Sequence, residues 1–542
     1  MLNENSAYVV NDIDINLRYV TYPLFLETSK KKERSIIMRK FFSGFFKFLV
    51  FAFSIILQFL FFYLIYIRVN EFDKYAPQVM WVIKLMAVLN IIYKSEKSSY
   101  KISWIVFIMV LPVAGILSYC FFGNEIIPKK LKKLMGELDR KEKYCPPQNT
   151  KILSKIKNPD VVKDADLLYN LSVSPIYSNT LTEYLSTGEE FFERMMIDIR
   201  NAKKFIFMEY FIFREGEMFS EILDALVAKI QEGVEVYVIY DGWGCLNPVL
   251  EKFSHYKDKF NLLSYQFNPY FNSLFSFISF RDHRKITIID GDISYCGGIN
   301  IADEYINKRE RFGHWKDMAL RLEGDGTFGF TLMFLKMLEL LTARDFDADL
   351  YRPTKNVSFS DGYVIPYCDG PTNPLHPAES IYKKIIATAK KYVYITTPYL
   401  DIDTAFLSQM CLAAQSGVDI RIIIPHIPDK KIVHKTSRSF YSELLTKGVR
   451  IYEYTPGFVH GKVVVVDDVC AIVGSINMDY RSLAWNYESA VYINDSHTVV
   501  DIKEDMLKII DISEEVNPEK YTDEGLIRRL SHAILRVFAP LM

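Results

Sequence analysis

The sequence predicts an α/β protein in which one type of domain occurs twice, each copy a mixed sheet flanked by helices, behind an N-terminal helical membrane anchor. Three observations predict it. A run near the start is almost free of polar side chains, strand-like and helix-like patterns alternate from about residue 150 onward, and three short segments recur at nearly constant spacing. The 542 residues also exceed the roughly 250–300 that one hydrophobic core covers, so at least two units are expected.

The composition excludes several classes of protein. The 65 basic and 66 acidic residues nearly cancel, which argues against a nucleic-acid binder, and the 39 Phe and 35 Tyr exclude a disordered chain. The mean hydropathy of +0.05 is high for a soluble protein. The seven Cys form no CxxC pair, so we expect neither a disulfide framework nor a Cys-based zinc site.

The start of the chain has the pattern of a cytoplasmic segment followed by a membrane span. Residues 48–67 read FLVFAFSIILQFLFFYLIYI and contain no charged side chain. Twenty helical residues cover about 30 Å, the thickness of a bilayer core, and buried core helices are seldom so long and so aromatic. Basic residues concentrated between positions 30 and 47 place segment 1–47 in the cytoplasm.

Two further apolar stretches leave the number of spans open. Residues 80–93 are interrupted by Lys84, and residues 102–122 contain Pro112 and Gly115. Basic residues also follow the last stretch, and two cytoplasmic ends require an even number of crossings. Either the middle stretch lies in the interface or the last one re-enters.

The remaining chain alternates strand-like and helix-like patterns, as in a mixed sheet covered by helices. Near the end, apolar residues between Gly525 and Phe538 fall on one helical face with arginines off it. Contact with anionic lipid and docking onto the domain both fit this stripe. The expected organisation is a basic segment at 1–47, a membrane region at 48–123, a linker at 124–165, a first half at 166–355, a second half at 356–515 and a C-terminal amphipathic helix at 516–542.

The duplication is visible in the sequence itself. Residues 283–300 (HRKITIIDGDISYCGGIN) align with residues 460–477 (HGKVVVVDDVCAIVGSIN), 177 positions later. Three collinear matches at nearly constant spacing indicate a domain repeated within one chain. The two earlier matches, in the same order, pair residues 202–207 with 389–394 and residues 233–239 with 417–423.

Each copy of the motif predicts a hairpin that presents polar side chains together. His283 and Lys285 are two residues apart on a β-branched strand, so both point to one face, and Asn300 follows on the returning strand. His460, Lys462 and Asn477 repeat the arrangement in the second half. One copy makes half a site, and two copies related by a pseudo-twofold axis would bring two imidazoles and two ammonium groups into one cleft.

Asp290 and Asp467 complete the two motifs, and we group them with the candidate catalytic residues on that basis. Their position at the strand end favours a different role, because Asp290-Gly291 and Asp467-Asp468 are typical turn pairs. We therefore expect these carboxylates to fix the hairpins rather than to transfer protons.

Such a cleft suits a phosphodiester. Lysines and asparagines supply positive charge and hydrogen-bond donors, while one neutral imidazole attacks phosphorus and the opposite imidazolium protonates the departing alkoxide. Neither a metal nor a cofactor is expected, because the lysine pair stabilises the charge. A lone His on a strand is more often structural. Here the same His and Lys positions recur in both halves, and burying an unpaired Lys is costly, so we favour a catalytic site.

These two motifs also make the sequence resemble a known family. HxKxxxxD followed by GGxN or GSxN, twice in one chain, is the signature of the phospholipase D superfamily. Within it the chain is similar to the bacterial cardiolipin synthases over nearly all residues beyond 40. This closer likeness rests on the membrane region 100–123, on GGINIADEY (297–305) with Trp315-Lys-Asp317, and on GSINMDYRSLAWNYE (474–488).

The resemblance implies transfer of a phosphatidyl group between two phosphatidylglycerol molecules in a multi-pass protein of the bacterial cell membrane, with the catalytic domain in the cytoplasm. The implied partners are phosphatidylglycerol, other anionic phospholipids and the membrane. Nucleic acid is not an expected partner. Position by position, His283 or His460 is the phosphohistidine nucleophile and the other the general acid and base. Lys285, Lys462, Asn300 and Asn477 hold the phosphate.

The resemblance also assigns supporting residues. Glu488 matches the acidic residue that orients the second-motif His, and Asp317 takes that role in the first half. Gly298 departs from the Ser that many superfamily members carry, and segment 1–29 has no assigned function. A phospholipase D that releases phosphatidic acid would use the same residues. A nuclease or a non-catalytic scaffold fits less well, given the charge balance and both intact His.

Overall fold

The computed structural model describes residues 49–50, 52–63, 75–94, 97–123, 129–245, 247–260, 262–267, 280–355, 357, 362–522 and 525–541. Segment 1–47 and part of the expected span 48–67 lie outside these residues. The chain divides into two units, residues 1–50 and 51–542, and all elements named below belong to the second.

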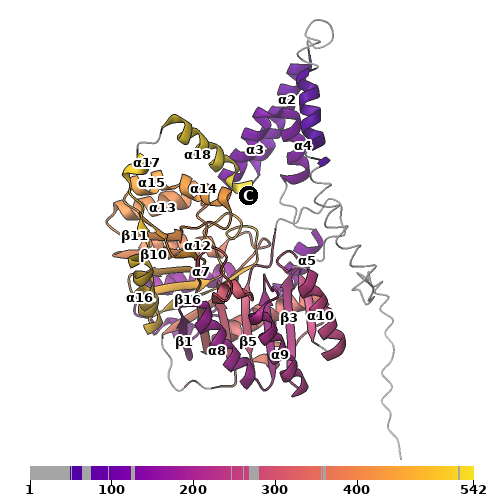
Figure 1. The fold of residues 1–542 in the computed structure, drawn as a ribbon, viewed down its shortest axis with the longest axis vertical. Coiled ribbons are helices and arrows are strands. Elements are labelled where there is room, and N and C mark those ends of the chain that lie inside the picture. The colour runs from indigo at the N-terminus through magenta and orange to yellow at the C-terminus, as the bar shows by residue number, and fades with distance from the viewer. Residues whose placement is uncertain are drawn as a thin grey trace, which may run out of the picture. The chain divides into compact units, whose positions relative to one another are not determined.

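The first half contains a seven-stranded mixed sheet in the order β1-β8-β6-β5-β2-β3-β4 (Figure 1). Strands β2, β3 and β4 run parallel, and the others pair antiparallel. The strands are β1 (Thr180–Leu185), β2 (Phe205–Tyr210), β3 (Glu235–Asp241), β4 (Leu263–Phe267), β5 (Lys285–Ile289), β6 (Ile293–Gly297) and β8 (Ala319–Gly324).

The second half repeats this plan in an eight-stranded sheet, ordered β17-β12-β11-β10-β14-β15-β16-β9. The hairpin β14–β15 lies beside β10 as β5–β6 lies beside β2, which confirms the predicted duplication. The strands are β9 (Tyr363–Asp369), β10 (Tyr392–Thr396), β11 (Asp419–Pro425), β12 (Arg450–Tyr454), β14 (Lys462–Val466), β15 (Cys470–Gly474), β16 (Glu488–Asn494) and β17 (Glu514–Glu515). A short parallel ribbon, β7 (His314–Lys316) with β13 (Gly457–Val459), joins the halves.

The helices mostly cover the two sheets, whereas the first three pack mainly with one another. They are α2 (Ala76–Tyr93), α3 (Ser98–Val110), α4 (Pro112–Phe122), α5 (Lys129–Leu138), α6 (Thr150–Leu153), α7 (Pro159–Ser172), α8 (Gly188–Asn201), α9 (Glu217–Gln231), α10 (Asn247–Phe260), α11 (Thr327–Thr342), α12 (Pro377–Thr388), α13 (Thr404–Gln415), α14 (Lys431–Ser439), α15 (Tyr441–Thr446), α16 (His497–Asp511), α17 (Glu519–Thr522) and α18 (Leu526–Phe538). Short 3-10 turns are η1 (Glu142–Tyr144), η2 (Asp303–Ile306), η3 (Ala348–Tyr351) and η4 (Ala539–Leu541).

The period of two along each strand builds a layered core. On β2, Phe205 and Phe207 pack into a central core that also contains α11, α16 and one face of the second sheet. The alternate residues Ile206 and Met208 pack against α8 and α9 on the opposite face. Both faces of each sheet are thus buried, which explains why the central strands read as continuous apolar runs.

Helix α7 lies across the sequence boundary predicted at residue 166. Its apolar residues pack with α12 and the outer face of the second sheet. Asp164 accepts a hydrogen bond from the Tyr492 hydroxyl and lies 3.3 Å from Lys384 Nζ. Residues 166–172, assigned by sequence to the first half, therefore belong to the second, because local pattern does not tell which sheet an amphipathic helix covers.

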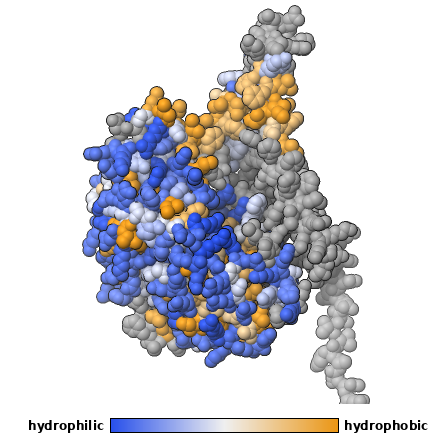
Figure 2. Space-filling view, viewed as in Figure 1, coloured by the Kyte–Doolittle hydropathy of each residue, from blue (hydrophilic) through white to orange (hydrophobic). Residues whose placement is uncertain are grey.

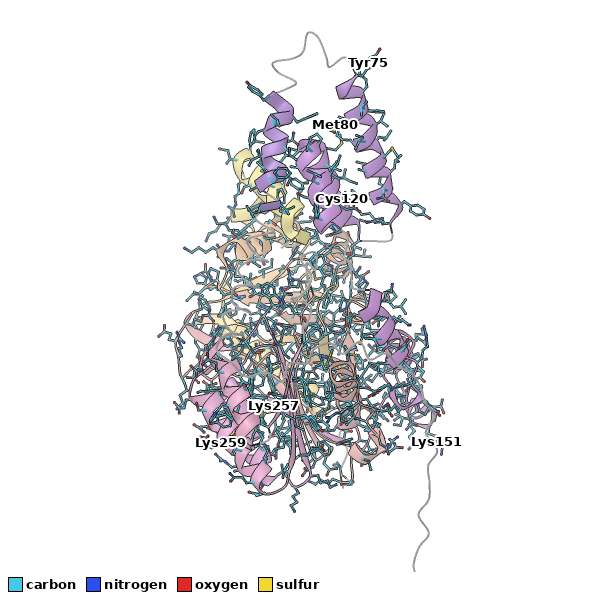
Figure 3. All side chains as sticks on the ribbon, turned by 90° about the vertical axis from the view of Figure 1, so that its right-hand side faces the viewer. Tyr75, Met80, Cys120, Lys151, Lys257 and Lys259 are labelled. Carbon is cyan, nitrogen blue, oxygen red and sulfur yellow. The ribbon has the colours of Figure 1, made fainter. Side chains whose placement is uncertain are left out.

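The apolar stretch expected at 102–122 is not one helix. Pro112 has no N–H to continue α3, so the chain turns at Leu111 and restarts as α4 with proline in its first turn. Within the described ranges, no helix combines the length and the apolarity that crossing a bilayer requires. Side chains on α2–α4 are nevertheless widely exposed and hydrophobic (Figure 2). Figure 3 shows Tyr75, Met80 and Cys120 within this helical group, and Lys257 and Lys259 on α10.

The two motif hairpins close through left-handed turns. Asp290 and Gly291 have φ of 57° and 76°, and Asp467 and Asp468 have 57° and 60°. Positive φ at both central positions is the turn geometry that matches the twist of paired strands. Asx residues and glycine adopt it at little cost, which explains their place in the motif.

Both motif carboxylates bind backbone rather than face the cleft described below. Asp290 accepts hydrogen bonds from the amides of residues 203–205, and Asp467 from those of residues 390–392. Each lies seven residues from its motif histidine, on the order of 20 Å along a strand. These contacts agree with the expected hairpin role, and neither aspartate lines the cleft described below, which argues against their grouping with the catalytic residues.

Replacing Asp467 by Asn should therefore lower stability and spare chemistry. Losing a carboxylate that accepts three amide hydrogen bonds should reduce the free energy of unfolding by about 1–3 kcal/mol. Thermal melts and turnover of the same preparation measure both effects. A loss of turnover in protein that melts normally would contradict the anchoring role.

Candidate active site

The two hairpins meet at one cleft of about 630 Å³, lined by residues of both halves. His283, Asn300, His460 and Asn477 all line it, as the motif analysis predicted. Each histidine lies where its strand begins, at the carboxyl end of the neighbouring strand β2 or β10. The duplication thus brings two half-sites together at equivalent edges of the two sheets.

The lysines lie behind the imidazoles. Lys285 and Lys462 are 2% and 1% exposed. Lys285 Nζ donates to the His283 carbonyl at 2.5 Å, and Lys462 Nζ lies 2.9 Å from His460 Nδ1 and donates to the His460 carbonyl. Burial lowers the pKa of Lys285 to about 8 and that of Lys462 to about 7. The charge of Lys285 also disfavours that of Lys462, and a bound phosphate anion would offset this repulsion.

Each histidine is held by a carboxylate of the other half. His283 Nδ1 lies 3.0 Å from both oxygens of Glu488, and His460 Nδ1 lies 2.6 Å from Asp317 Oδ2. The expectation that Glu488 orients the second-motif His and Asp317 the first is wrong, because the partners are exchanged. With Nδ1 bound to a carboxylate, Nε2 is the ring nitrogen that remains for substrate.

The backbone explains this exchange. The His283 amide donates to the Tyr487 carbonyl at 2.9 Å, and the His460 amide donates to the Lys316 carbonyl at 2.7 Å. Each motif therefore runs alongside the segment that precedes the opposite carboxylate. This pairing across the pseudo-twofold axis leaves no local trace in the sequence.

Gly298 and Ser475 differ because the two carboxylates differ in length. The Ser475 hydroxyl donates to Glu488, and Asn486 Nδ2 donates to the same carboxylate at 3.2 Å. At position 298 a Cβ would overlap Asp317 Oδ1, so the shorter acid fills the space that a side chain would occupy. Sequence analysis missed the support by Ser475 and Asn486. The paired differences, Gly with Asp and Ser with Glu, are the signal that could have revealed it.

Burial and the paired charges set the protonation of the site. Burial lowers the pKa of His460 to about 3, with the charge of Lys462 adding to the effect, and burial also lowers the pKa of His283. Although burial alone would raise them, the pKa values of Asp317 and Glu488 are lowered by the facing imidazoles. Both carboxylates are therefore ionised, and the ligand-free imidazoles are neutral at pH 7.

The two asparagines are not equivalent. Asn300 Oδ1 accepts from the Ile212 amide at 3.0 Å, and its Nδ2 donates to the Tyr305 hydroxyl at 2.7 Å. The Asn477 Oδ1, buried in the cleft wall, has no hydrogen-bond partner among the residues that the structure describes. Asn300 therefore also braces the loop after β2, whereas the Asn477 carboxamide faces the cleft.

The walls also differ between the halves. The His460 ring lies 5.3–5.8 Å from the rings of Tyr305, Trp315 and Phe458. Arg281 and Arg481 line the cleft on the side of His283, and the charge of Arg481 contributes to lowering the pKa of Arg281, after burial, to about 10. The His283 ring in turn lies 5.1 Å from that of Phe211, so the surroundings of the two imidazoles differ.

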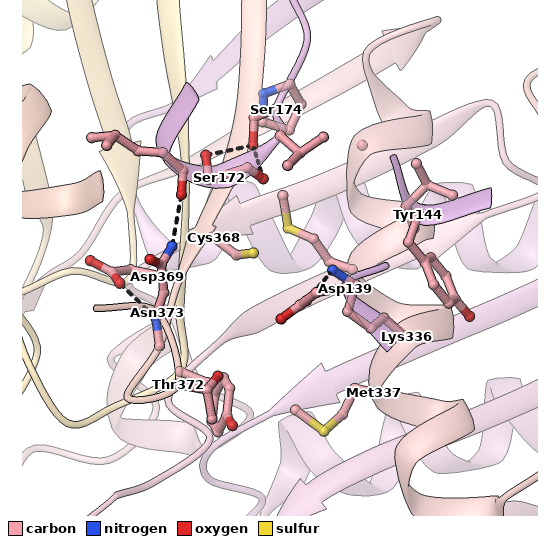
Figure 4. Close-up of a pocket in the computed structure, with 18 of the residues that line it drawn as sticks. Asp139, Tyr144, Ser172, Ser174, Lys336, Met337, Cys368, Asp369, Thr372 and Asn373 are labelled. Atoms are coloured by element: carbon pink, nitrogen blue, oxygen red, sulfur yellow. Dashed lines mark hydrogen bonds and ion pairs between the residues drawn. The ribbon is translucent and has the colours of Figure 1, made fainter. Parts of the chain in front are cut away.

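A second cavity of about 270 Å³ lies between α5, α11 and β9 (Figure 4). Its charged residues have partners, since Lys336 Nζ lies 2.9 Å from Asp139, and Asp369 accepts from the amides of Gly370 and Ala378. It contains neither motif histidine. Across the part of the chain that the structure describes, no cluster of His, Cys, Asp or Glu is arranged to hold a metal ion.

Comparison with known proteins identifies the family. A sequence model described as "Cardiolipin synthase, PLD-like domain" matches residues 195–311 and 382–510, which contain the two motifs. The chain is 33% identical to cardiolipin synthase 2 of Bacillus anthracis, over 83% of this chain and 88% of that protein. The chain belongs to the cardiolipin synthase family.

Other likenesses agree with this membership. An uncharacterized protein of Streptococcus mutans is 38% identical over 84% of this chain and 99% of its own length. A model described as "Phospholipase_D-nuclease N-terminal" matches residues 80–124, the region of α2–α4. The crystal structure of phosphatidylserine synthase from Haemophilus influenzae shares the fold, with a TM-score of 0.52 and 18% identity over 70% of this chain and 98% of that chain.

Replacing Gly298 by Ala should lower turnover, although residue 298 does not line the cleft. The added methyl group would displace Asp317 from His460, and misplacing a catalytic group by about 1 Å costs about 10²-fold in rate. Turnover of folded variant protein measures this. Gly136→Ala on α5, where a Cβ would meet nothing within 4 Å, is the matched control. Equal turnover of the two variants would contradict the packing argument.

The lysine pKa values predict a fall in activity with rising pH. Lys462 loses its proton above about pH 7 in the free protein, and a neutral amine cannot stabilise phosphate charge. kcat/KM should therefore decline through about pH 7–8, while kcat declines at higher pH because bound phosphate raises the pKa. Profiles of both constants test this. A kcat/KM that stays constant to about pH 9 would be inconsistent with a titrating Lys462.

Proposed function

We propose that this chain makes cardiolipin by transferring a phosphatidyl group from one phosphatidylglycerol to a second, with release of glycerol. One observation carries the proposal: two imidazoles from the two halves line one cleft, each with Nδ1 held by a buried carboxylate of the opposite half. Such a pair supplies a nucleophile and an acid for exchange at a phosphodiester. Family membership supports the same reaction, because relatives carry the name of this product.

The reaction proceeds in two displacements. Binding of the anionic phosphodiester raises the pKa of the imidazole opposite the nucleophile, which takes up a proton. Nε2 of the other imidazole attacks the phosphorus of the donor lipid, the phosphorus–oxygen bond to glycerol breaks, and the imidazolium gives its proton to the leaving alkoxide. The second imidazole, now neutral, takes the proton of a hydroxyl of the acceptor headgroup. That oxygen attacks phosphorus, and the phosphorus–nitrogen bond breaks. Cardiolipin leaves, and both histidines return to their starting states.

The remaining motif residues hold the phosphate in this proposal. The ammonium groups of Lys285 and Lys462 stabilise the charge that develops on the phosphoryl oxygens, and Asn477 provides its carboxamide from the cleft wall. Asn300 contributes mainly by bracing the loop after β2. We assign the step to these side chains, without a metal or an organic cofactor.

Two features favour a lipid acceptor over water. The cleft of about 630 Å³ has room for more than one headgroup, and Arg281 and Arg481 add positive charge beside His283. A second phosphodiester requires such charge, whereas hydrolysis to phosphatidic acid does not.

We also propose a location at the bacterial cell membrane, with a multi-pass anchor and a cytoplasmic catalytic domain. The exposed apolar side chains of α2–α4 support membrane attachment. Helix α3 joins this region to the site, because the Tyr100 ring packs 5.8 Å from that of Trp485, which lines the cleft. A substrate that resides in the bilayer would thus meet the cleft beside the anchor.

Incubation of purified protein with phosphatidylglycerol as the only phospholipid tests the reaction. We expect cardiolipin and glycerol in equal amounts by mass analysis, and no loss of activity with EDTA. Phosphatidic acid without cardiolipin would show a hydrolase instead. His283→Ala and His460→Ala should each lower turnover by at least about 10³-fold, because neither imidazole replaces the other. His255→Ala, an exposed histidine on α10, is the control and should retain turnover.

A further inference from the structure

The C-terminal helix α18 carries an apolar face that the protein does not cover. The sequence left two roles open for this stripe, docking onto the domain and contact with lipid. In the structure Val537 is half-buried where the helix packs against its neighbours, whereas most of the large apolar residues of the stripe remain exposed. Their exposed fractions are 83% for Leu526, 87% for Ile527, 61% for Leu530, 50% for Ile534 and 40% for Phe538.

The polar side of α18 fixes its orientation. Arg536 donates to Glu443 at 3.0 Å and to the Ser439 carbonyl at 2.7 Å, and its guanidinium lies 4.6 Å from the ring centre of Phe440. Ala539, just after the helix, is 2% exposed. The C-terminal end of α18 is thus attached to the segment joining α14 and α15. This packing orients the helix, so the exposure of its apolar face does not result from fraying of the chain end.

The helix itself carries no acidic side chain, although Asp523 and Glu524 precede it in the chain. Residues 525–542 contain three arginines and no Asp or Glu. The adjoining helix α14 adds Lys431 and Lys435, together with Ile432, which is 62% exposed. Apolar side chains bordered by cations match an anionic phospholipid surface. The apolar side chains can insert into the acyl region, and the cations can pair with the anionic headgroups.

The position of α18 relates it to the cleft. It packs against α3 and α14 (Figure 1). Helix α14 supplies Val433 to the cleft lining, and Tyr100 of α3 contacts Trp485, which also lines the cleft. Its exposed face is also one of the hydrophobic surfaces visible near α2–α4 in Figure 2. A surface that binds α18 therefore also fixes how far the cleft lies from that surface.

We propose that α18 lies in the headgroup layer of an anionic phospholipid bilayer, with Leu530 and Ile534 in the acyl region, and that this contact holds the cleft at the membrane surface. The proposal concerns a binding surface. It adds to the membrane anchor a second attachment at the far end of the chain, and it does not depend on which reaction the cleft performs.

Site-specific fluorescence tests the contact in the full chain. An environment-sensitive dye is attached at Leu530→Cys in a Cys120→Ser background, since Cys120 is the exposed native thiol among the described residues. In vesicles containing phosphatidylglycerol, we expect a blue shift and quenching by lipids brominated close to the headgroup. The same dye attached at Lys257→Cys on α10 is the control. It should not be quenched by lipids brominated close to the headgroup or by lipids brominated deep in the acyl chain. Unquenched dye at Leu530→Cys in vesicle-bound protein would overturn the proposal.

A charge substitution gives an independent readout. Leu530→Glu with Ile534→Glu should lower cardiolipin production on phosphatidylglycerol vesicles at least about tenfold and leave it unchanged in detergent micelles, where no surface must be held. Leu350→Glu, at an exposed leucine of η3, is the control and should change neither. Equal activity of the double variant on vesicles and in micelles would contradict the inferred contact. Loss in both assays, with folded protein, would also overturn it, since the helix would then act on catalysis itself. A substrate other than phosphatidylglycerol would remove activity from the unmodified protein but not the quenching.

Discussion

The pairing of each imidazole with a carboxylate of the opposite half is the interaction on which the rest of the site depends. It requires two histidines, two lysines and two acids to share a largely buried space. Neither half can satisfy these charges alone, because a buried lysine or carboxylate without its counter-charge is costly. The ribbon of β7 with β13 and the bridge from Asp282 to Tyr487 keep the halves in register, so the active site and the interface between the halves are one structure.

The duplication supplies symmetry, and small departures from it suit a reaction whose two displacements differ. Asp317 with Gly298 and Glu488 with Ser475 are two ways of filling the same space behind an imidazole. Three aromatic rings surround the His460 imidazole, whereas the ring of Phe211 and the arginines 281 and 481 lie near His283, so the two imidazoles have different surroundings. Donor and acceptor lipids share a headgroup but occupy different steps, so a cleft whose two imidazoles have different surroundings can hold each in its own orientation.

Periodicity predicted much of the fold, because local spacing decides which strand faces are buried. The repeated Ala-Lys-Lys segments at 202–204 and 389–391 gained an explanation only in three dimensions, since amides there bind Asp290 and Asp467. Hydropathy alone did not show that Pro112 divides the stretch 102–122 into two helices. Nor did it show that α7 covers the second sheet, because an amphipathic helix carries no record of its partner.

The sequence by itself determined the duplicated α/β plan, the two histidines and lysines, and the family, because these reside in local spacing and in a repeat that can be aligned. Only the tertiary structure decided which carboxylate serves which imidazole, that Asn300 braces a loop while Asn477 faces the cleft, and that the stripe of α18 points outward. Those outcomes depend on contacts between segments as much as 205 residues apart. Such contacts are set by how two sheets pack, and no local pattern of residues encodes them.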